Sequence, residues 1–349
     1  MWIAPQYSKT RVRKAGNAIR DNQSTIEDHL VLENWRACHS YILNTFQANL
    51  RNRSRGNDIT VAQRLKRRVT IIDKLQREPH MQLSTMQDIA GCRIIFSEEP
   101  QLLNFRKSMH SARFKHDLKN KADDRYNYIT HPKMSGYRGI HDIYEYQVSS
   151  HQGIAWNGLL IEIQYRTQVQ HAWATAVEIA DLATFSRIKF SQADDDHREF
   201  FRLASEILAR TYENRNSCMI DHNNEDLIEE FSRIDRRLGM MLMFRNLKLS
   251  ESKIRFRTNM ILIFPFQSDS TKESDLQVET FDSINKAIER YDQLEKDLAE
   301  KADIVLVRAD NPENIRDAFR NYFSDAIDFV KYLIDGIEEL RKKPSMKLY

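Results

Sequence analysis

The chain has 349 residues, of which 41% are hydrophobic and 30% are charged. This composition supplies enough apolar surface for a folded core and excludes a wholly disordered chain, and the length suits one large domain or two ordinary ones. The formal net charge is only +3, but residues 1–80 contain 15 lysines and arginines against 7 acidic residues. A basic region of this kind favours an anionic partner, either nucleotide phosphates or nucleic acid, although a solvated basic helix face would give the same pattern.

The first half of the chain is predicted to contain both helices and strands. Helices are expected at 26–50, 60–77 and 101–112, strands at 91–96, 140–148 and 159–167, and a further helix at 168–183. Within the helix expected over 60–77, one face carries Leu65, Val69, Ile72 and Gln76, and another carries Lys66, Thr70 and Lys74.

The second half begins with a helix from 193 to about 213, followed by a polar, turn-rich stretch at 214–226 that is the best candidate for a domain boundary. Beyond it we expect a helix at 225–247, a strand at 254–266, a polar loop at 267–275, a helix at 281–298, a strand at 302–310 and helices to the end. The sequence therefore predicts two domains, residues 1–220 and a smaller α/β module at 221–349. The helix at 281–298 and the apolar strand at 258–266 are candidates for a homo-oligomer interface, but ordinary core packing is the favoured explanation for both.

Three widely spaced cysteines offer neither a disulfide framework nor a CxxC metal pair. The first residues lack the apolar core of a signal peptide, and the longest apolar run, MILIFPF at 260–266, is too short to span a bilayer. We therefore expect a cytoplasmic protein without a membrane partner.

The strand expected over 159–167 carries a carboxylate, an amide and a guanidinium on one face, from Glu162, Gln164 and Arg166. Magnesium takes one or two carboxylates and completes its shell with phosphate oxygens and water. Asp88, just before the strand at 91–96, is the candidate second carboxylate, and Arg93 follows on that strand. These residues predict a binding site for a metal-bound phosphate, with Mg²⁺ held by Asp88 and Glu162.

Cations and one aromatic residue complete this inventory. Arg64, Lys66 and Lys74, with the hydroxyl of Thr70, suit a polyphosphate chain. The loop YITHPKMSGYRGIH at 128–141 supplies Lys133, Tyr137 between Gly136 and Arg138, and His141. Each residue alone is more often structural: a surface lysine, a packed tyrosine or a buried histidine. Together they favour phosphoryl or pyrophosphoryl transfer, which depends on positioning and charge neutralisation.

Four ordered motifs carry a family resemblance. They are RLKRRVTIIDK (64–74), QDIAGCRII (87–95), YITHPKMSGYRGIH (128–141) and EIQYRTQVQHAWA (162–174). This order resembles the synthetase domain of RelA/SpoT homologues over roughly residues 50–185. The resemblance implies an α+β fold, a mixed β-sheet flanked by helices and related to nucleotidyltransferases. It also implies a magnesium-dependent enzyme of the GTP pyrophosphokinase type, which moves pyrophosphate from ATP to the 3′-hydroxyl of GDP or GTP.

The resemblance also implies roles for single residues. Asp88 and Glu162 would hold magnesium, and Glu162 would also activate the attacking hydroxyl. The residues implied for ATP and its phosphates are Arg64, Lys66, Thr70, Lys74 and Arg93. The residues implied for the acceptor are Lys133, Tyr137, His141, Gln164, Arg166 and His171. Thr70 and Gly139 stand where the family pattern has serine, and Gly139 loosens the acceptor loop, so the identity of the acceptor stays open.

Two alternatives remain beside alarmone synthesis. One is a toxin-type relative that places pyrophosphate on the 3′ end of tRNA, and the other is a catalytically inactive nucleotide-binding regulator, which the two acids disfavour. The two His-Asp pairs, at 116–117 and 141–142, have no helical hydrolase domain around them, so we expect no hydrolase activity. The module at 221–349 is a candidate internal inhibitor, a sensor of a regulatory ligand, or the binding site of an antitoxin.

Overall fold

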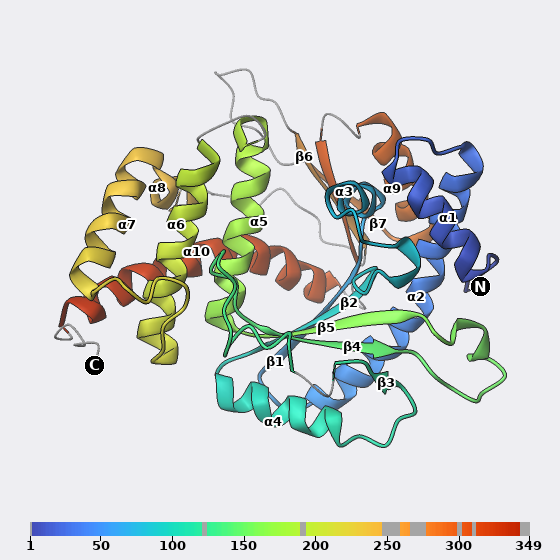
Figure 1. Cartoon of the computed structure of the whole chain (residues 1–349), viewed down its shortest axis with the longest axis horizontal. Helices are drawn as coiled ribbons and strands as arrows, with labels where there is room; N and C mark the ends of the chain where they lie inside the picture. Colours follow the sequence, from blue (N-terminus) through green and yellow to red (C-terminus); the bar gives the residue numbers. More distant parts are fainter. Residues whose placement is uncertain are drawn as a thin grey trace. The chain divides into compact units, whose positions relative to one another are not determined.

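The computed structural model describes residues 2–120, 124–188, 193–245, 259–265, 277–298, 302–308 and 312–342 (Figure 1). By their contacts they form two compact units. The first unit comprises Met1–Pro132 and Arg138–Gln168, and the second comprises Lys133–Tyr137 and Val169–Tyr349. These units are defined by packing, and the functional division at residue 220 stays a prediction.

The first unit is built on a five-stranded sheet in the order β1-β2-β5-β4-β3. The strands are β1 (Ile59–Leu65), β2 (Ala90–Phe96), β3 (Asp117–Leu118), β4 (Ile140–Glu145) and β5 (Leu160–Thr167). Strands β2 and β5 are parallel and the other neighbours are antiparallel. Strands are therefore mixed in direction, and the predicted α+β class with a mixed sheet flanked by helices is confirmed.

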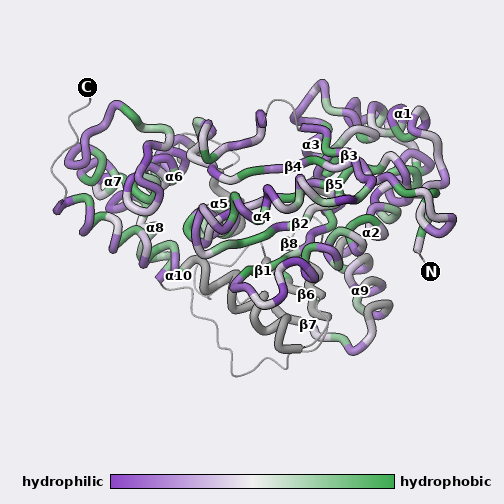
Figure 2. Tube along the Cα trace, turned by 90° about the horizontal axis from the view of Figure 1, so that it is seen from below, coloured by the Kyte–Doolittle hydropathy of each residue, from purple (hydrophilic) through white to green (hydrophobic). Residues whose placement is uncertain are grey.

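One face of this sheet is apolar and covered by helices. The helices of the unit are α1 (Lys9–Arg20), α2 (Ile26–Ser54), α3 (Arg68–Arg77) and α4 (Glu99–His110). Phe105 of α4 lies 5.4 Å from Phe96 between ring centroids, and Phe46 of α2 lies 5.6 Å from Tyr144. Burying these rings stabilises the layer, since each removes a large apolar area from water. Figure 2 shows the hydropathy of the residues along the strands and helices.

The opposite face carries the polar side chains. Along β5, Ile161, Ile163 and Tyr165 are fully buried, while Glu162 and Gln164 alternate with them on the other side. The alternation predicted for this strand is confirmed. Gly91 is paired with Glu162, and Arg93 with Gln164, so the polar positions of β2 and β5 lie side by side.

The helix predicted over 60–77 is wrong in its first half. Ile59–Leu65 is strand β1, paired antiparallel with β2 along its whole length, and the helix begins only at Arg68. Its buried residues are Ile71 and Leu75, whereas Gln76 is exposed. This segment is a strand because its pairing with β2 along seven residues stabilises it more than its local helix propensity would stabilise a helix.

The second unit is mainly helical. Its helices are α5 (Gln168–Ile188), α6 (Ala193–Leu208), α7 (Asn224–Leu238), α8 (Met240–Arg245) and α10 (Pro312–Lys342), with a π-helical turn at Ala209–Glu213. The predicted helix at 225–247 is divided at Gly239, which has φ +69° and ends α7 in a left-handed conformation. Every helix in the described part of the chain is too short or too polar to span a lipid bilayer.

A second, three-stranded antiparallel sheet in the order β7-β6-β8 belongs to this unit. Its elements are β6 (Asn259–Pro265), β7 (Gln277–Phe281), α9 (Ile284–Asp297) and β8 (Ala302–Arg308). Ile261, Ile263, Tyr291 and Leu294 form its core. Phe281, predicted to begin a helix, is the last residue of β7, so the helix begins at Ile284. The loop predicted at 267–275 lies outside the described residues.

Candidate active site

Asp88 is held by two lysines from the sequence stretch that follows β1. Lys66 Nζ lies 2.8 Å from Asp88 Oδ2, and Lys74 Nζ lies 3.1 Å from Asp88 Oδ1. The backbone N–H of Lys66 also donates to the carbonyl of Ile89. This bond continues the β1–β2 pairing and places Lys66 close to Asp88. Burial alone would raise the pKa of Asp88, but the charges of Lys66 and Lys74 outweigh it and lower the pKa.

Glu162 on β5 is bound by neighbours on the polar sheet face. His141 Nδ1 lies 2.9 Å from Glu162 Oε1, and Gln164 Nε2 donates to Glu162 Oε2 at 2.6 Å. Burial would raise the pKa of Glu162, yet the nearby His141 and Gln164, with the charge of Lys74, lower it to about 2. Glu162 is therefore an ionised carboxylate at neutral pH.

The two acids lie within electrostatic reach of each other. The charge of Glu162 opposes the lowering of the Asp88 pKa, and the charge of Lys74 lowers the pKa of both acids. This follows from the topology: Asp88 stands two residues before β2, and β5 runs parallel to β2 with Glu162 opposite Gly91. Asp88, Glu162 and the lysines thus form one cluster, which we call the acid–lysine cluster.

The other sequence candidates of the first unit extend this polar face. Arg64 on β1 is exposed and is paired with Gly91, and Arg93 on β2 is paired with Gln164. Arg166 Nη2 donates to Gln164 Oε1 at 3.1 Å and is buried. Thr70 is different, because its hydroxyl donates to the carbonyl of Arg67 within the first turn of α3. Its contact in the structure is therefore with the backbone of its own helix.

Three acceptor candidates belong to the second unit. Lys133 Nζ lies 5.4 Å from the ring centroid of Tyr137, and the Tyr137 ring lies 6.3 Å from that of Trp173 on α5. His171 is buried on α5. The two residues from the loop thus stand close together, whereas His171 is placed by a helix.

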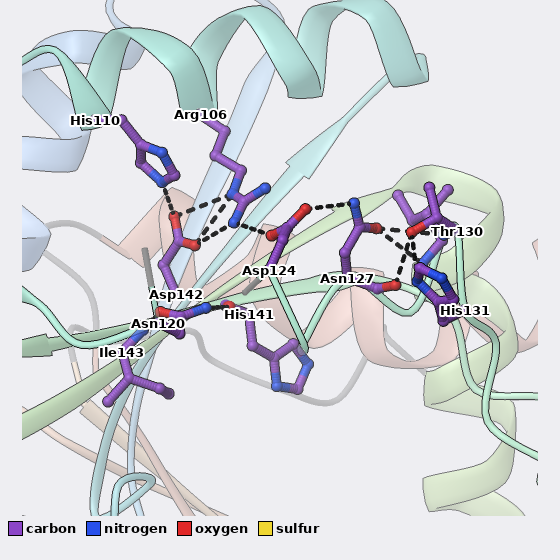
Figure 3. A network of polar contacts seen from close by, with 11 residues as sticks. Arg106, His110, Asn120, Asp124, Asn127, Thr130, His131, His141, Asp142 and Ile143 are labelled. Atoms are coloured by element: carbon purple, nitrogen blue, oxygen red, sulfur yellow. Dashed lines mark hydrogen bonds and ion pairs between the residues drawn. The ribbon is translucent and has the colours of Figure 1, made fainter. Parts of the chain in front are cut away.

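Sequence reasoning missed a buried charge network beneath β4, shown in Figure 3. Asp142, fully buried, accepts hydrogen bonds from Arg106 of α4 and lies 2.7 Å from His110 Nε2. Arg106 Nη2 also reaches Asp124 at 2.6 Å, and Asn127 donates to the same carboxylate. Burial would raise the pKa of Asp142, but the hydrogen bonds of His110 and Arg106 lower it.

This network fixes the strand that presents His141. Residues 141 and 142 point to opposite faces of β4, so Asp142 holds the strand from the helical side while His141 meets Glu162 on the polar side. The side chain of Asn120 accepts from the Ile143 N–H and donates to the His141 carbonyl. The feature of the sequence that indicates this network is Asp142 of the His-Asp pair, an acid at a strand position that faces the core.

The donor set of the cluster fits magnesium. The coupled carboxylates of Asp88 and Glu162 offer oxygen ligands, the type that Mg²⁺ prefers. Within the described ranges, no group of three or more His, Cys, Asp or Glu side chains forms a metal cluster. A site of two carboxylates is the kind that phosphate oxygens and water complete, so the residues fit a metal bound together with a nucleotide.

Coupled acids and lysines beside the polar face of a mixed sheet suit the binding of phosphate groups. The family model described as "Region found in RelA / SpoT proteins" matches residues 63–182, which contain the acid–lysine cluster. Over this region, about a third of its length, the chain is similar to RelA/SpoT proteins.

Two curated relatives show the same similarity. Over 185 residues the chain is 29% identical to the uncharacterized protein Rv1366 of Mycobacterium tuberculosis, covering 50% of this chain and 59% of that protein. Over 119 residues it is 35% identical to the GTP pyrophosphokinase YjbM of Bacillus subtilis, covering 33% and 52%. The matched part thus spans between half and three fifths of each relative.

Solved structures from Bacillus subtilis match about half of this chain. Small alarmone synthetase 1 bound to its product pppGpp is 26% identical with a TM-score of 0.42, covering 50% of this chain and 89% of that chain. Small alarmone synthetase 2 is 23% identical with a TM-score of 0.40, covering 52% and 92%.

Proposed function

We propose that the chain is an ATP-dependent 3′-pyrophosphotransferase that makes a (p)ppGpp-type alarmone from GDP or GTP. The observation that carries this proposal is the acid–lysine cluster, Asp88 and Glu162 with Lys66 and Lys74, inside the RelA/SpoT region. The GTP pyrophosphokinase among the relatives supports the same reaction.

Lys66 and Lys74 are proposed to bind the triphosphate of ATP. Arg64 on β1 and Arg93 on β2 are proposed to bind it as well. The charges of the two lysines face the two acids in the free protein, and an anionic polyphosphate provides a second set of partners for them. Asp88 and Glu162 would hold Mg²⁺, which when bound neutralises charge on the transferred pyrophosphoryl group.

Glu162 suits the role of a permanent anion better than that of a general base. A general base works best with a pKa near the operating pH, and the pKa of Glu162 is about 2. In this arrangement His141 and Gln164 keep the carboxylate ionised and oriented. The activation of the acceptor hydroxyl, which the family resemblance implies for Glu162, therefore requires a change in these contacts.

The acceptor nucleotide is proposed to bind through Tyr137 by stacking on its base and through Lys133 by contact with its phosphates. Their proximity supports this assignment, since a base and its phosphates are joined within one nucleotide. His141, Gln164, Arg166 and His171 are proposed as further acceptor contacts.

The test is a transfer assay with purified full-length protein, magnesium and ATP labelled at the β-phosphate. GDP, GTP, an adenine nucleotide and bulk tRNA are offered separately. We expect label in a guanine nucleotide. Label in tRNA alone would replace the proposal by the toxin-type reaction, and label in no acceptor, with ATP binding retained, would contradict enzymatic transfer altogether.

A further inference from the structure

The segment Lys133–Tyr137 forms a tight turn of its own. The Gly136 N–H donates to the Lys133 carbonyl at 2.8 Å, and the Lys133 N–H donates to the Tyr137 carbonyl at 3.2 Å. The turn thereby brings the two side chains together, with the Lys133 ammonium 5.4 Å from the centroid of the Tyr137 ring. We call residues 133–137 the acceptor turn; this name rests on the proposed function.

Gly136 is the point at which helix α6 meets the acceptor turn. Its φ is +88°, a conformation that residues with a Cβ rarely adopt. A Cβ at this position would also stand 2.8 Å from the Cβ of Ser205 and 3.3 Å from the carbonyl oxygen of Phe201. The backbone of the turn therefore lies directly on α6, and only glycine permits so close an approach.

Ser205 makes the specific bond at this contact. Its hydroxyl donates to the Gly136 carbonyl at 2.5 Å and lies 3.0 Å from the hydroxyl of Ser217. Ser205 is fully buried, so removing its hydroxyl would leave the Gly136 carbonyl without this donor in the protein interior. One turn earlier on α6, the Phe201 carbonyl accepts from Trp173 Nε1 at 2.9 Å, which holds the ring beside Tyr137.

The C-terminal helix α10 packs against the same part of α6. The Phe329 ring lies 6.1 Å from Phe201 and 5.5 Å from Phe244, and Phe329 is fully buried. Just beyond α6, the Thr211 hydroxyl donates to the Gly336 carbonyl at 3.3 Å. Figure 1 shows α10 running beside α6 and α7 within this unit. Truncation at residue 221 would remove Phe244 and Phe329, so we expect it to expose the aromatic core instead of releasing an inhibited enzyme.

We propose that Ser205 is a positioning residue for the acceptor nucleotide, and that α10 supports it by fixing α6. Ser205 touches no reacting atom; it holds the turn from which Lys133 and Tyr137 project. The C-terminal part of the chain would then set the affinity for the acceptor without affecting the acid–lysine cluster.

The test compares Ser205→Ala with Ser232→Ala in the full-length protein. Ser232 also donates its hydroxyl to a backbone carbonyl, that of Ile228 within α7, so it controls for the loss of a serine hydroxyl elsewhere in the unit. For Ser205→Ala we expect the KM of the guanine acceptor to rise about five- to tenfold, the scale of one lost buried hydrogen bond, with the KM of ATP unchanged. Equal rises in both KM values, or a rise in neither, would overturn the proposal.

A second variant tests the support from α10. Phe329→Leu keeps an apolar side chain but loses the ring contacts with Phe201 and Phe244. We expect the same selective rise in the acceptor KM, with a melting temperature that still shows a folded unit. A folded variant with an unchanged acceptor KM would contradict the supporting role of α10.

Amide hydrogen exchange separates this inference from the proposed function. In Ser205→Ala, a peptide that covers residues 131–140 should exchange faster, while Ser232→Ala leaves it unchanged, whether or not the protein transfers pyrophosphate. Faster exchange with no transfer to any acceptor in the unaltered protein would contradict only the proposed function. Unchanged exchange in Ser205→Ala would contradict the positioning role.

Discussion

The substitution Asp88→Asn tests what the two lysines are for. In the unaltered protein their ammonium groups lie 2.8 and 3.1 Å from the two oxygens of one carboxylate. Asparagine keeps the shape and one acceptor oxygen but removes the charge. Lys66 and Lys74 then face each other without this counter-charge, in a site where their side chains are only 14% and 18% exposed.

The expected magnitude follows from this geometry. Removing one partner of a buried ion pair costs about 3–5 kcal/mol of stability, and Asp88 keeps 24% of its side chain exposed, so we expect a loss of about 2–3 kcal/mol. An anionic triphosphate can replace the lost carboxylate as a partner of both lysines. We therefore expect ATP to bind about tenfold tighter in the absence of magnesium, a gain of about 1.4 kcal/mol, while magnesium-dependent transfer falls steeply.

Titration calorimetry of ATP in a chelating buffer and in magnesium measures both effects. Asp73→Asn is the matched control, because it removes an acid of α3 whose ion pair with Arg77 is largely exposed. Weaker ATP binding by Asp88→Asn in the chelating buffer would refute the reasoning, since it would mean that Lys66 and Lys74 are not directed at the nucleotide.

Three further outcomes are expected. Burial lowers the pKa of His39 from 6.5 to about 4, so the unfolded chain binds the proton at a higher pH than the folded protein does. The free energy of unfolding should therefore fall by about 3 kcal/mol as the pH falls from 6.5 to 4. Urea titrations of His39→Gln should lack this dependence on pH. Asp142→Asn should lose about 3 kcal/mol at pH 7 by leaving Arg106 and His110 without their shared acid; the difference should shrink in strong acid, where Asp142 of the unaltered protein becomes protonated, and an equal difference at every pH would contradict the charge argument. Tyr137→Ala should raise the acceptor KM by the equivalent of about 1–3 kcal/mol of base stacking and leave the KM of ATP unchanged; equal losses in steady-state kinetics would exclude the stacking role.

The parts of the fold that the sequence predicts are those with a strong local period. The polar and apolar residues of strand β5 alternate from Ile161 to Arg166, and its bounds, Leu160–Thr167, lie within one residue of the expectation. The stretch at 59–65 has an apolar pattern that suits a strand or a helix, and only its pairing with β2 decides between them. Local pattern therefore predicts an element well where it is unambiguous, and tertiary pairing decides the rest.

The site shows the same limit. The polar face of β5 and the paired acids follow from alternation and from motif order. The hydroxyl of Ser205 lies 69 residues from Gly136 along the chain, and Asp142 meets Arg106 across 36 residues. No local pattern joins such pairs, because they are set by which helix covers which face.

The most direct measurement of the central claim is pyrophosphate transfer by Glu162→Gln. The side-chain amide keeps the size of Glu162 and removes its charge, while Lys66 and Lys74 remain on Asp88. Glu145→Gln on β4, an acid that accepts from Gln147 and lies near Lys119, serves as the control. Transfer of label from ATP to GDP or GTP should fall below detection in Glu162→Gln, with ATP binding retained and the control active. Full transfer by Glu162→Gln would contradict the assignment of the acid–lysine cluster as the active site.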